Sequence, residues 1–480
     1  MATTPYPTTL AEIQFNENQD NKALYQNIKA LRKSTLSIAN RLQSILTDAN
    51  FVQLVSKHHQ LPLVANERCG SWYIPPALKV GSAYFKSTDG HHGQWDFSAR
   101  RLNLQVLDVL GQHGGAVIVD STRRGKNLSD ALSKTVPTWV AVMNRSLFPD
   151  MVAWHKLCLP REVGESEYAQ VDARLDGFVQ KFHGLGLDVD ALRGKVKKPI
   201  KVTWAIHGTD DVFDDDEDDD TAEDEQDDKE KNYCTLILCS ASRRVHGAEM
   251  SENGYIQGAG DDHEGWSMGL TPQLFWEHHD ELLSTPEAGM SDLIAAYLAA
   301  ALSLSAADEE VPPVLIRPTS NIYISARRAP TEQPQTRIQT KESDYTINCN
   351  GRAPSSPSKT VLNLTCAPGR QGSKDLREKL SSAREFAWQA LKQDGEDARI
   401  LVTCETGRDL SVGVAVMLLC LFYGDDGALL DLEGAGAVQV QVDKQLVKRR
   451  LAWITGVKSD ANPSRATLQA VNTVIMGRPV

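Results

Sequence analysis

A loop with the sequence CETGRDLS, at positions 404–411, carries residues well suited to chemistry. An apolar run at 400–402 precedes it and predicts a buried strand, and an apolar run at 411–423 follows and predicts a buried helix. A loop between a strand and a helix points several backbone N–H groups at one spot, which favours binding of an anion such as phosphate. The candidate substrate-binding residues are Cys404, Glu405, Thr406, Gly407, Arg408, Asp409 and Ser411.

A cysteine in this setting could instead be the nucleophile of a tyrosine or dual-specificity phosphatase. That chemistry requires an arginine six residues after the cysteine, whose guanidinium binds the phosphate through two parallel hydrogen bonds. Position 410 is leucine, so the pattern fails and we reject phosphatase activity. Two interpretations remain: an anion-binding loop without a nucleophile, or a loop that only caps the helix.

A second loop, DSTRRGK at 120–126, follows the apolar run GGAVIV at 114–119. Ligands of open α/β sheets bind at the carboxyl ends of the strands, where this loop is expected to lie. Its three cations suit a pyrophosphate or a nucleic-acid backbone, although an exposed basic turn is the alternative. It matches neither the Walker pattern nor the common phosphoribosyltransferase loop with its doubled acid. The candidate ligands are Thr122, Arg123, Arg124 and Lys126, with Asp120 as an acid and Lys134 near the start of the next predicted helix.

Two further polar groups complete the candidates. Lys86, Asp89 and His91 lie close together in the sequence, and Arg100 and Arg101 follow them. The glycine-rich segment 254–266 carries three acids that could hold Mg²⁺, which binds carboxylates and keeps waters and substrate phosphates. A solvated acidic turn is the alternative. The candidate metal ligands are Asp261, Asp262 and Glu264.

The elements that must position these residues belong to a chain of 480 residues, long enough for two or more domains. The net charge of −12 is misleading, because residues 210–231 carry 15 acidic and 2 basic side chains, and the remainder is +1. So dense a block of like charge predicts a disordered loop. The sequence shows no long apolar segment and no signal peptide at its start. Its eight cysteines show no paired spacing, which favours a reducing, cytoplasmic compartment.

The periodicity predicts an α/β protein with two domains. In the first, residues 1–330, we expect a helix at 21–47, strands joined by turns at 69–91, a helix at 129–144 and a strand at 234–240. Residues 331–358 are rich in Pro, Ser and other polar residues and predict a linker or long loop. The second domain, residues 359–480, should contain strands near 361–364 and 400–402 and helices near 374–391, 411–423, 443–455 and 463–476.

Long and unusual motifs then point to a family. The runs CGSWY, AYFKSTDGHHGQWDFSARRLN, VIVDSTRRGK, DALSKTVPTWVAVMNR and YIQGAGDDHEGW resemble the initiator tRNA phosphoribosyltransferases of fungi and plants. The resemblance covers nearly the whole chain. It implies a larger N-terminal α/β domain and a C-terminal α/β domain like that of dual-specificity phosphatases, in which CETGRDLS is a degenerate cysteine loop.

The resemblance also implies a reaction: transfer of a 5-phosphoribosyl group from 5-phosphoribosyl 1-pyrophosphate to the 2′-hydroxyl of a T-stem adenosine of initiator methionine tRNA, which keeps that tRNA out of elongation. Mg²⁺ would assist, and one of the candidate catalytic residues Asp89, His91, Asp120 and Asp262 would take the proton of the hydroxyl. The shape of the RNA should be read mainly through its backbone. Candidate contacts to the tRNA backbone are Arg32, Arg100, Arg101, Lys444, Lys448, Arg449 and Arg450.

The alternative of another class is a non-catalytic tRNA- or phosphate-binding protein built on an inactive phosphatase fold.

Overall fold

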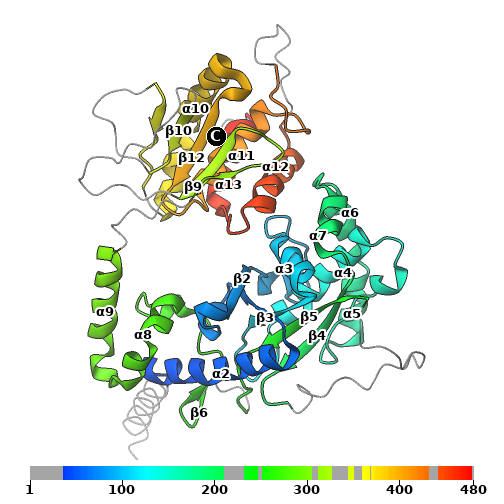
Figure 1. Ribbon diagram of the computed structural model, residues 1–480, viewed down its shortest axis with the longest axis vertical. Coiled ribbons are helices and arrows are strands. Elements are labelled where there is room, and N and C mark those ends of the chain that lie inside the picture. Colours follow the sequence, from blue (N-terminus) through cyan, green and yellow to red (C-terminus); the bar gives the residue numbers. More distant parts are fainter. Residues whose placement is uncertain are drawn as a thin grey trace, which may run out of the picture.

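The structure is a computed structural model, and it describes residues 36–209, 232–246, 251–304, 312–326, 344–350, 359–367, 369–431 and 442–477. It contains two five-stranded sheets, one in each half of the chain, and a short hairpin (Figure 1). The α/β class and the division into a larger N-terminal and a smaller C-terminal unit are confirmed. Within the described part, no helix has the length and apolar character needed to cross a membrane. The predicted acidic loop at 210–231 lies outside the described residues.

The N-terminal sheet is wholly parallel, with the strand order β2-β1-β3-β5-β4. Its central strand is completely buried because both of its faces are covered by helices. On one face Ala116 and Ile118 pack into a core with helices α3, α4, α6 and α7, while on the other Val117 and Val119 pack with α2 and α8. The strands are β1 (Leu63–Asn66), β2 (Lys79–Ala83), β3 (Gly115–Asp120), β4 (Ile200–Ile206) and β5 (Cys234–Ser240).

The helices of this unit are α2 (Ile38–His59), α3 (Gln105–His113), α4 (Val136–Leu147), α5 (Glu165–Asp172), α6 (Leu175–His183), α7 (Val189–Val196), α8 (Pro272–Ser284) and α9 (Glu287–Leu304). Short 3₁₀ helices occupy Gly70–Tyr73, Pro76–Leu78, Ser87–Gly90, Val152–His155 and His263–Gly265, and a π-helical turn spans Ala131–Thr135. The antiparallel hairpin consists of β6 (Ser251–Glu252) and β7 (Tyr255–Ile256).

The C-terminal sheet has the order β11-β10-β12-β9-β8 and is parallel except for β8. Helix α11 follows β12 and is almost entirely buried, as its continuous apolar sequence predicts. The strands are β8 (Val314–Leu315), β9 (Ile322–Ala326), β10 (Asp344–Asn348), β11 (Val361–Asn363) and β12 (Arg399–Cys404). The helices are α10 (Gly369–Asp394), α11 (Leu410–Phe422), α12 (Lys444–Val457) and α13 (Arg465–Ile475), with a 3₁₀ helix at Gly395–Asp397.

The domain boundary differs from the prediction. Strands β8 and β9 precede position 330 in the sequence, yet both pair within the C-terminal sheet. Strand β10 lies inside the predicted linker at 331–358 and pairs with β12. Periodicity missed these strands because each is only two to five residues long and polar residues flank it.

Three local predictions are also corrected. Residues 21–35 of the helix predicted at 21–47 lie outside the described residues. In the described part the prediction is corrected: α2 begins after Ser37, whose side chain accepts a hydrogen bond from the Asn40 N–H, and it continues to His59. The segment 69–91 forms one strand and three 3₁₀ helices rather than a series of strands. The helix predicted at 129–144 starts with the π-helical turn, because Pro137 has no N–H for a regular helical bond to the preceding turn.

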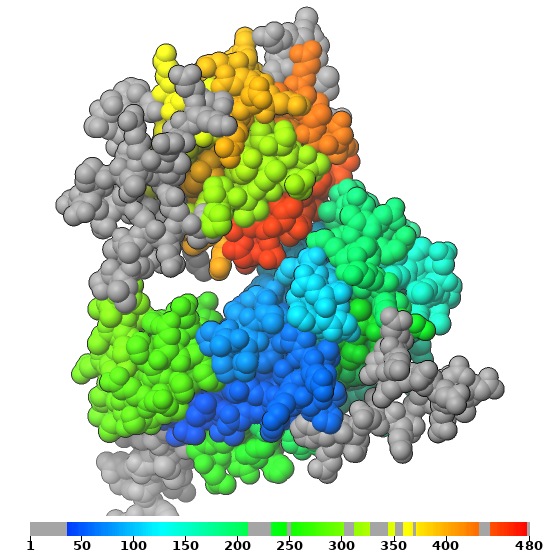
Figure 2. Space-filling view, in the orientation of Figure 1, coloured from blue at the N-terminus to red at the C-terminus, as the bar shows by residue number. Residues whose placement is uncertain are grey.

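The two units contact each other along one side. The Arg100 guanidinium of the N-terminal unit donates a hydrogen bond to the Pro463 carbonyl, just before α13. Ala452 of α12 is buried with the residues of the N-terminal core. In the space-filling view, the red C-terminal segment accordingly touches the cyan and green parts of the N-terminal unit (Figure 2).

Candidate active site

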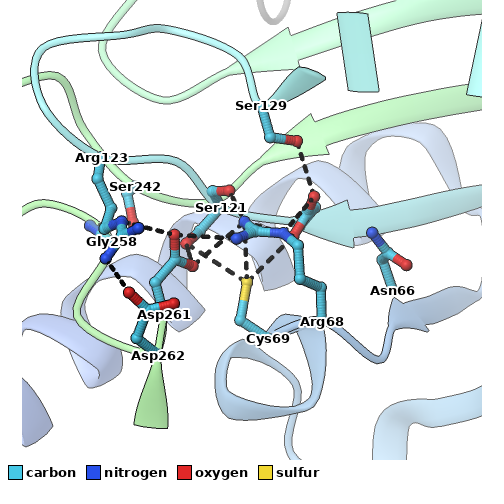
Figure 3. Close-up of polar contacts among 12 residues, drawn as sticks. Asn66, Arg68, Cys69, Ser121, Arg123, Ser129, Ser242, Gly258, Asp261 and Asp262 are labelled. Atoms are coloured by element: carbon cyan, nitrogen blue, oxygen red, sulfur yellow. Dashed lines mark hydrogen bonds and ion pairs between the residues drawn. The ribbon is translucent and has the colours of Figure 1, made fainter. Parts of the chain in front are cut away.

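The polar centre of the N-terminal unit lies at the carboxyl ends of β1 and β3, where the loop at 257–262 joins them (Figure 3). Arg68 follows β1 by two residues and reaches across this edge. Its guanidinium donates to Asp120 at 3.1 Å, to Asp261 at 3.1 Å and to the carbonyl of Ser121. Burial alone would lower the pKa of Arg68, but the charges of the surrounding acidic groups raise it above its ordinary value instead. This arginine therefore stays charged and joins the two loops.

Asp120, the last residue of β3, is completely buried and fully bonded. Besides Arg68, it accepts hydrogen bonds from the Ser129 hydroxyl at 2.7 Å and from the Cys69 thiol at 3.0 Å. Burial raises the pKa of Cys69 well above its ordinary value, so the thiol keeps the proton that it donates. Asp120 therefore lies at the centre of the site, where its carboxylate holds the side chains of Arg68, Ser129 and Cys69 in position.

Asp261 is the second buried carboxylate that holds neighbouring side chains in position. Its carboxylate accepts a hydrogen bond from the Ser121 hydroxyl at 2.8 Å in addition to those from Arg68. Tyr73 supports the same region, since its hydroxyl donates to Ser121 at 3.1 Å and accepts from the Gly260 N–H at 2.8 Å. Burial raises the pKa of Tyr73 well above its ordinary value, so it acts here as a neutral phenol.

The basic loop packs directly on the acidic loop. Asp262 has a left-handed backbone and its carboxylate pairs with Arg123. A Cβ atom on Gly258 would lie 2.5 Å from Cγ of Arg123 and 2.7 Å from the carbonyl oxygen of Thr122, so only glycine permits this approach. Of the other predicted ligands in the loop, Thr122 is buried, while Arg124 and Lys126 face outward.

The predicted magnesium ligands do not come together. The carboxylate of Asp261 is bound by Arg68 and Ser121, that of Asp262 faces Arg123, and Glu264 is exposed. Over the ranges that the structure describes, no three His, Cys, Asp or Glu side chains converge as a metal cage requires. These residues therefore do not fit a cage made of protein ligands alone.

A second polar cluster adjoins the basic loop. Lys134 is buried between the carboxylates of Asp130 and Glu167, at 2.9 and 3.2 Å, and His91 lies beside Asp130. Lys86, Asp89 and Arg101 line a separate small pocket, to which His91 and Asp130 do not contribute. Burial raises the pKa of Asp89, and the nearby charge of Arg101 opposes that rise only in part. Within this pocket region Arg101 also stacks over the ring of Tyr84.

The cysteine loop of the C-terminal unit joins the end of β12 to the buried helix α11, as predicted. Sγ of Cys404, at the end of β12, lies 3.1 Å from the hydroxyl of Ser411 in the first turn of α11. Burial alone would raise the pKa of Cys404, but hydrogen bonds from Ser411 and from backbone N–H groups outweigh it and lower that pKa. Gly407 has a positive φ, and a Cβ there would lie 2.7 Å from the backbone nitrogen of Ala326.

The charged residues of this loop point away from the thiol. Arg408 pairs with Asp460 at 2.9 Å, and Asp409 accepts hydrogen bonds from the Ser464 N–H and the Thr467 hydroxyl. The Glu405 side chain is exposed. Three N–H groups of the loop are bonded within the protein: that of Glu405 donates to Asn350, that of Gly407 to the Cys404 carbonyl and that of Arg408 to the Thr406 hydroxyl. Arg408 is paired with Asp460, and position 410 holds leucine instead of the phosphatase arginine.

Several residues of the site were missed from the sequence. Arg68, Ser121, Ser129 and Gln257 were not singled out, although all four are buried or half-buried in the centre. A signal existed for Arg68, since it follows the apolar run of β1 as the basic loop follows β3. No sequence pattern identifies Ser129 or Gln257, because their roles depend on contacts between distant segments.

Comparison with known proteins adds an independent observation. A family model described as the Rit1 N-terminal domain matches residues 31–299, and one described as the Rit1 DUSP-like domain matches residues 360–475. The chain is 32% identical to the tRNA A64-2′-O-ribosylphosphate transferase of Saccharomyces cerevisiae, over 97% of this chain and 98% of that protein. It is 34% identical to an uncharacterised protein of Schizosaccharomyces pombe, over 91% of this chain and 94% of that protein. No solved structure matches.

Proposed function

The chain belongs to the Rit1 family, and on that premise we propose that it transfers a 5-phosphoribosyl group to the 2′-hydroxyl of a T-stem adenosine in initiator methionine tRNA. The observation that carries this proposal is the Arg68-centred network at the carboxyl edge of the N-terminal sheet. It holds a loop rich in cations beside an acidic loop, which suits a donor carrying several phosphates. An enzyme of this kind is a pentosyltransferase.

The donor in this proposal is 5-phosphoribosyl 1-pyrophosphate. Breaking its bond between C1 and pyrophosphate builds positive character on the ribose and negative charge on the leaving group. In this proposal Arg123, Arg124 and Lys126 stabilise the leaving pyrophosphate, and the pairs of Arg68 with Asp120 and Asp261 support the position of their loop. Mg²⁺ would come with the pyrophosphate, which can supply its ligands.

The acceptor tRNA is proposed to lie over both units. Arg100 reaches the C-terminal unit at Pro463, next to Ser464, which hydrogen-bonds Asp409 of the cysteine loop. In this proposal a backbone phosphate of the same RNA binds beside the cysteine loop, at the N-terminus of α11. Binding through such contacts weakens steeply with salt, so an affinity that does not change with salt would contradict this role. A cytoplasmic location is part of the proposal, and the free state of all eight cysteines is consistent with it.

The direct test measures transfer from labelled donor to initiator tRNA, with elongator methionine tRNA as the control. We expect product only with initiator tRNA and a loss of activity in Arg123→Gln combined with Arg124→Gln, because the leaving group is no longer stabilised. Tight tRNA binding without product at any donor concentration would instead favour the non-catalytic alternative. That alternative is not favoured at present, because the Saccharomyces cerevisiae relative is a named transferase.

A further inference from the structure

The inference concerns an imidazole and a carboxylate at the edge of the basic loop. Nε2 of His91 lies 3.5 Å from Oδ2 of Asp130. Nζ of Lys126, in the basic loop, lies 4.0 Å from the same oxygen. Because 48% of the His91 side chain is exposed, a hydroxyl of a bound substrate can reach the ring.

Asp130 is held rigidly from two directions. Its second carboxylate oxygen pairs with Lys134 at 2.9 Å, and Lys134 is itself buried against Glu167. The preceding residue, Ser129, donates a hydrogen bond to Asp120 at 2.7 Å. The position of Asp130 is therefore tied directly to the Arg68-centred network.

The backbone brings His91 to Asp130 by a close approach that requires glycine. A Cβ on Gly90 would lie 2.5 Å from the carbonyl oxygen of Asp130 and 2.7 Å from the Thr135 hydroxyl oxygen. The turn Ser87–Gly90 thus packs directly on the π-helical turn Ala131–Thr135, and His91 follows at once. Single π-helical turns in helices are frequent at functional sites.

The other candidate bases are less available. Asp120 already accepts hydrogen bonds from Arg68, Cys69 and Ser129, and it has no exposed surface. Asp262 pairs with Arg123. Asp89 lines the separate pocket with Arg101, across Gly90 from His91. Among the four residues predicted to be catalytic, His91 alone combines an exposed ring with a neighbouring carboxylate beside the basic loop.

We propose that His91 is the general base of the transfer and that Asp130 is its positioning residue; the inference rests on the proposed function. In this proposal Asp130 orients the ring from the side of Nε2, which lies 3.5 Å from its Oδ2, so that Nδ1 faces the substrate. The 2′-oxygen of the acceptor forms a bond to C1 of the donor while the C1–pyrophosphate bond breaks and its electron pair leaves with pyrophosphate. The 2′-hydroxyl proton passes to Nδ1 of His91 and then to water. The charged and titratable groups around this ring are Asp130, Lys126, Lys134, Glu167 and His92.

The experiment compares kcat, KM and the pH profile of transfer for the full chain and three variants at these positions. For His91→Gln we expect kcat to fall about 10²- to 10⁴-fold with little change in either KM, and the acidic limb of the pH–rate profile to disappear. Added imidazole should restore activity to His91→Ala, since the site is open to solvent. For Asp130→Asn we expect a fall in kcat of about 10- to 100-fold without a change in KM, as for other partners that orient a catalytic imidazole.

The matched control is the adjacent histidine. His92 is 74% exposed and lies 3.6 Å from Glu167, so His92→Gln should keep the wild-type rate. A wild-type kcat in His91→Gln, or equal losses in the two histidine variants, would overturn the assignment of the base while leaving the transferase function intact. A wild-type protein that transfers no ribosyl phosphate would overturn the proposed function and this inference with it.

Discussion

The side-chain oxygen of Gln257 accepts a hydrogen bond from the backbone N–H of Gly125 at 2.9 Å. The same oxygen accepts a second hydrogen bond from the Val245 N–H at 3.1 Å, and the amide nitrogen donates to the Lys126 carbonyl at 2.7 Å. Gln257 is completely buried. One side chain therefore holds the basic loop against the loop that carries Asp261 and Asp262.

Replacing Gln257 with Met, which is similar in size, should destabilise the protein and loosen the basic loop. Two N–H groups and one carbonyl would lose their partner, and each unsatisfied buried group costs about 1–3 kcal/mol. We expect the free energy of unfolding to fall by about 3 kcal/mol and the KM for the donor to rise, as measured by chemical denaturation and transfer assays. The control is Gln273→Met, because Gln273 is exposed on α8 and bonds only across one helical turn. Equal effects of the two changes would contradict the role of Gln257.

Arg68→Met should be more damaging than the loss of a surface arginine. It leaves the buried carboxylates of Asp120 and Asp261 without their shared cation, and removal of one partner from a buried ion pair costs about 3–5 kcal/mol. Arg68→Lys should recover little, because one ammonium cannot replace the planar guanidinium that bonds both acids. Urea denaturation measures the loss of stability, and Arg449→Met is the control, because Asp425, the partner of Arg449, is 61% exposed. If Arg68→Met were as stable as the wild type, the ion pairs of Arg68 with Asp120 and Asp261 would not contribute to stability.

Long apolar segments made most of the fold predictable from the sequence. β3, β5 and α11 are mainly apolar in sequence and almost entirely buried in the structure, and β12 contains the predicted apolar run at 400–402. The short strands β8, β9 and β10 were not recognised, because their pairing partners rather than their own composition determine them. The domain boundary predicted at 330 is wrong for the same reason, because β8 and β9 belong to the C-terminal sheet.

The candidate site was predictable in part, for a similar reason. Asp120 and Cys404 are each the last residue of a strand that contains an apolar run. The sequence of that one strand is enough to predict that such a residue lies at the carboxyl edge of a sheet. Arg68, by contrast, bonds acids that lie 52 and 193 positions away in the sequence. The predicted metal ligands failed to converge because Asp262 turns away in a left-handed conformation and pairs with Arg123. Neither relationship is visible in local spacing.

Asp48 of α2 should make stability depend on pH. It is fully buried, and burial raises its pKa even though His207, Tyr255 and Ser242 all bond its carboxylate. The folded protein therefore binds this proton more tightly than the unfolded chain does. The resulting stabilisation is present below the unfolded value of 3.8 and is lost as the pH rises through the folded pKa.

Asp48→Asn removes this titration, so the difference in unfolding free energy between wild type and variant should change over that pH range. Denaturation at a series of pH values measures it, and wild type should lose stability relative to the variant as the pH rises. Asp48→Glu serves as the control, because it keeps a titrating carboxyl group. A constant difference between wild type and Asp48→Asn across the range would contradict the raised pKa.

Ser411→Ala should raise the pKa of Cys404. The Ser411 hydroxyl, 3.1 Å from the sulfur, is the largest of the hydrogen-bond contributions that lower this pKa against the effect of burial. The ultraviolet absorbance of the thiolate, measured as the difference from Cys404→Ser, should therefore appear at higher pH in Ser411→Ala than in wild type. Thr406→Val is the control and should shift the titration less, because the Thr406 hydroxyl lies 3.9 Å from the sulfur. Coincident titrations of wild type and Ser411→Ala would show that the backbone N–H groups alone stabilise the thiolate.

Cys404→Ser tests what this loop does in the reaction. A nucleophile would lose nearly all activity on this change, whereas an anion-binding loop keeps its N–H groups and its shape. Leu410 occupies the position of the phosphatase arginine and is buried, its side chain packed near Gly372. We therefore expect Cys404→Ser to keep most of the ribosyl phosphate transfer activity, and neither protein to hydrolyse a generic aryl phosphate. Aryl phosphate hydrolysis by the wild type that Cys404→Ser abolishes would restore the phosphatase interpretation that Leu410 argues against.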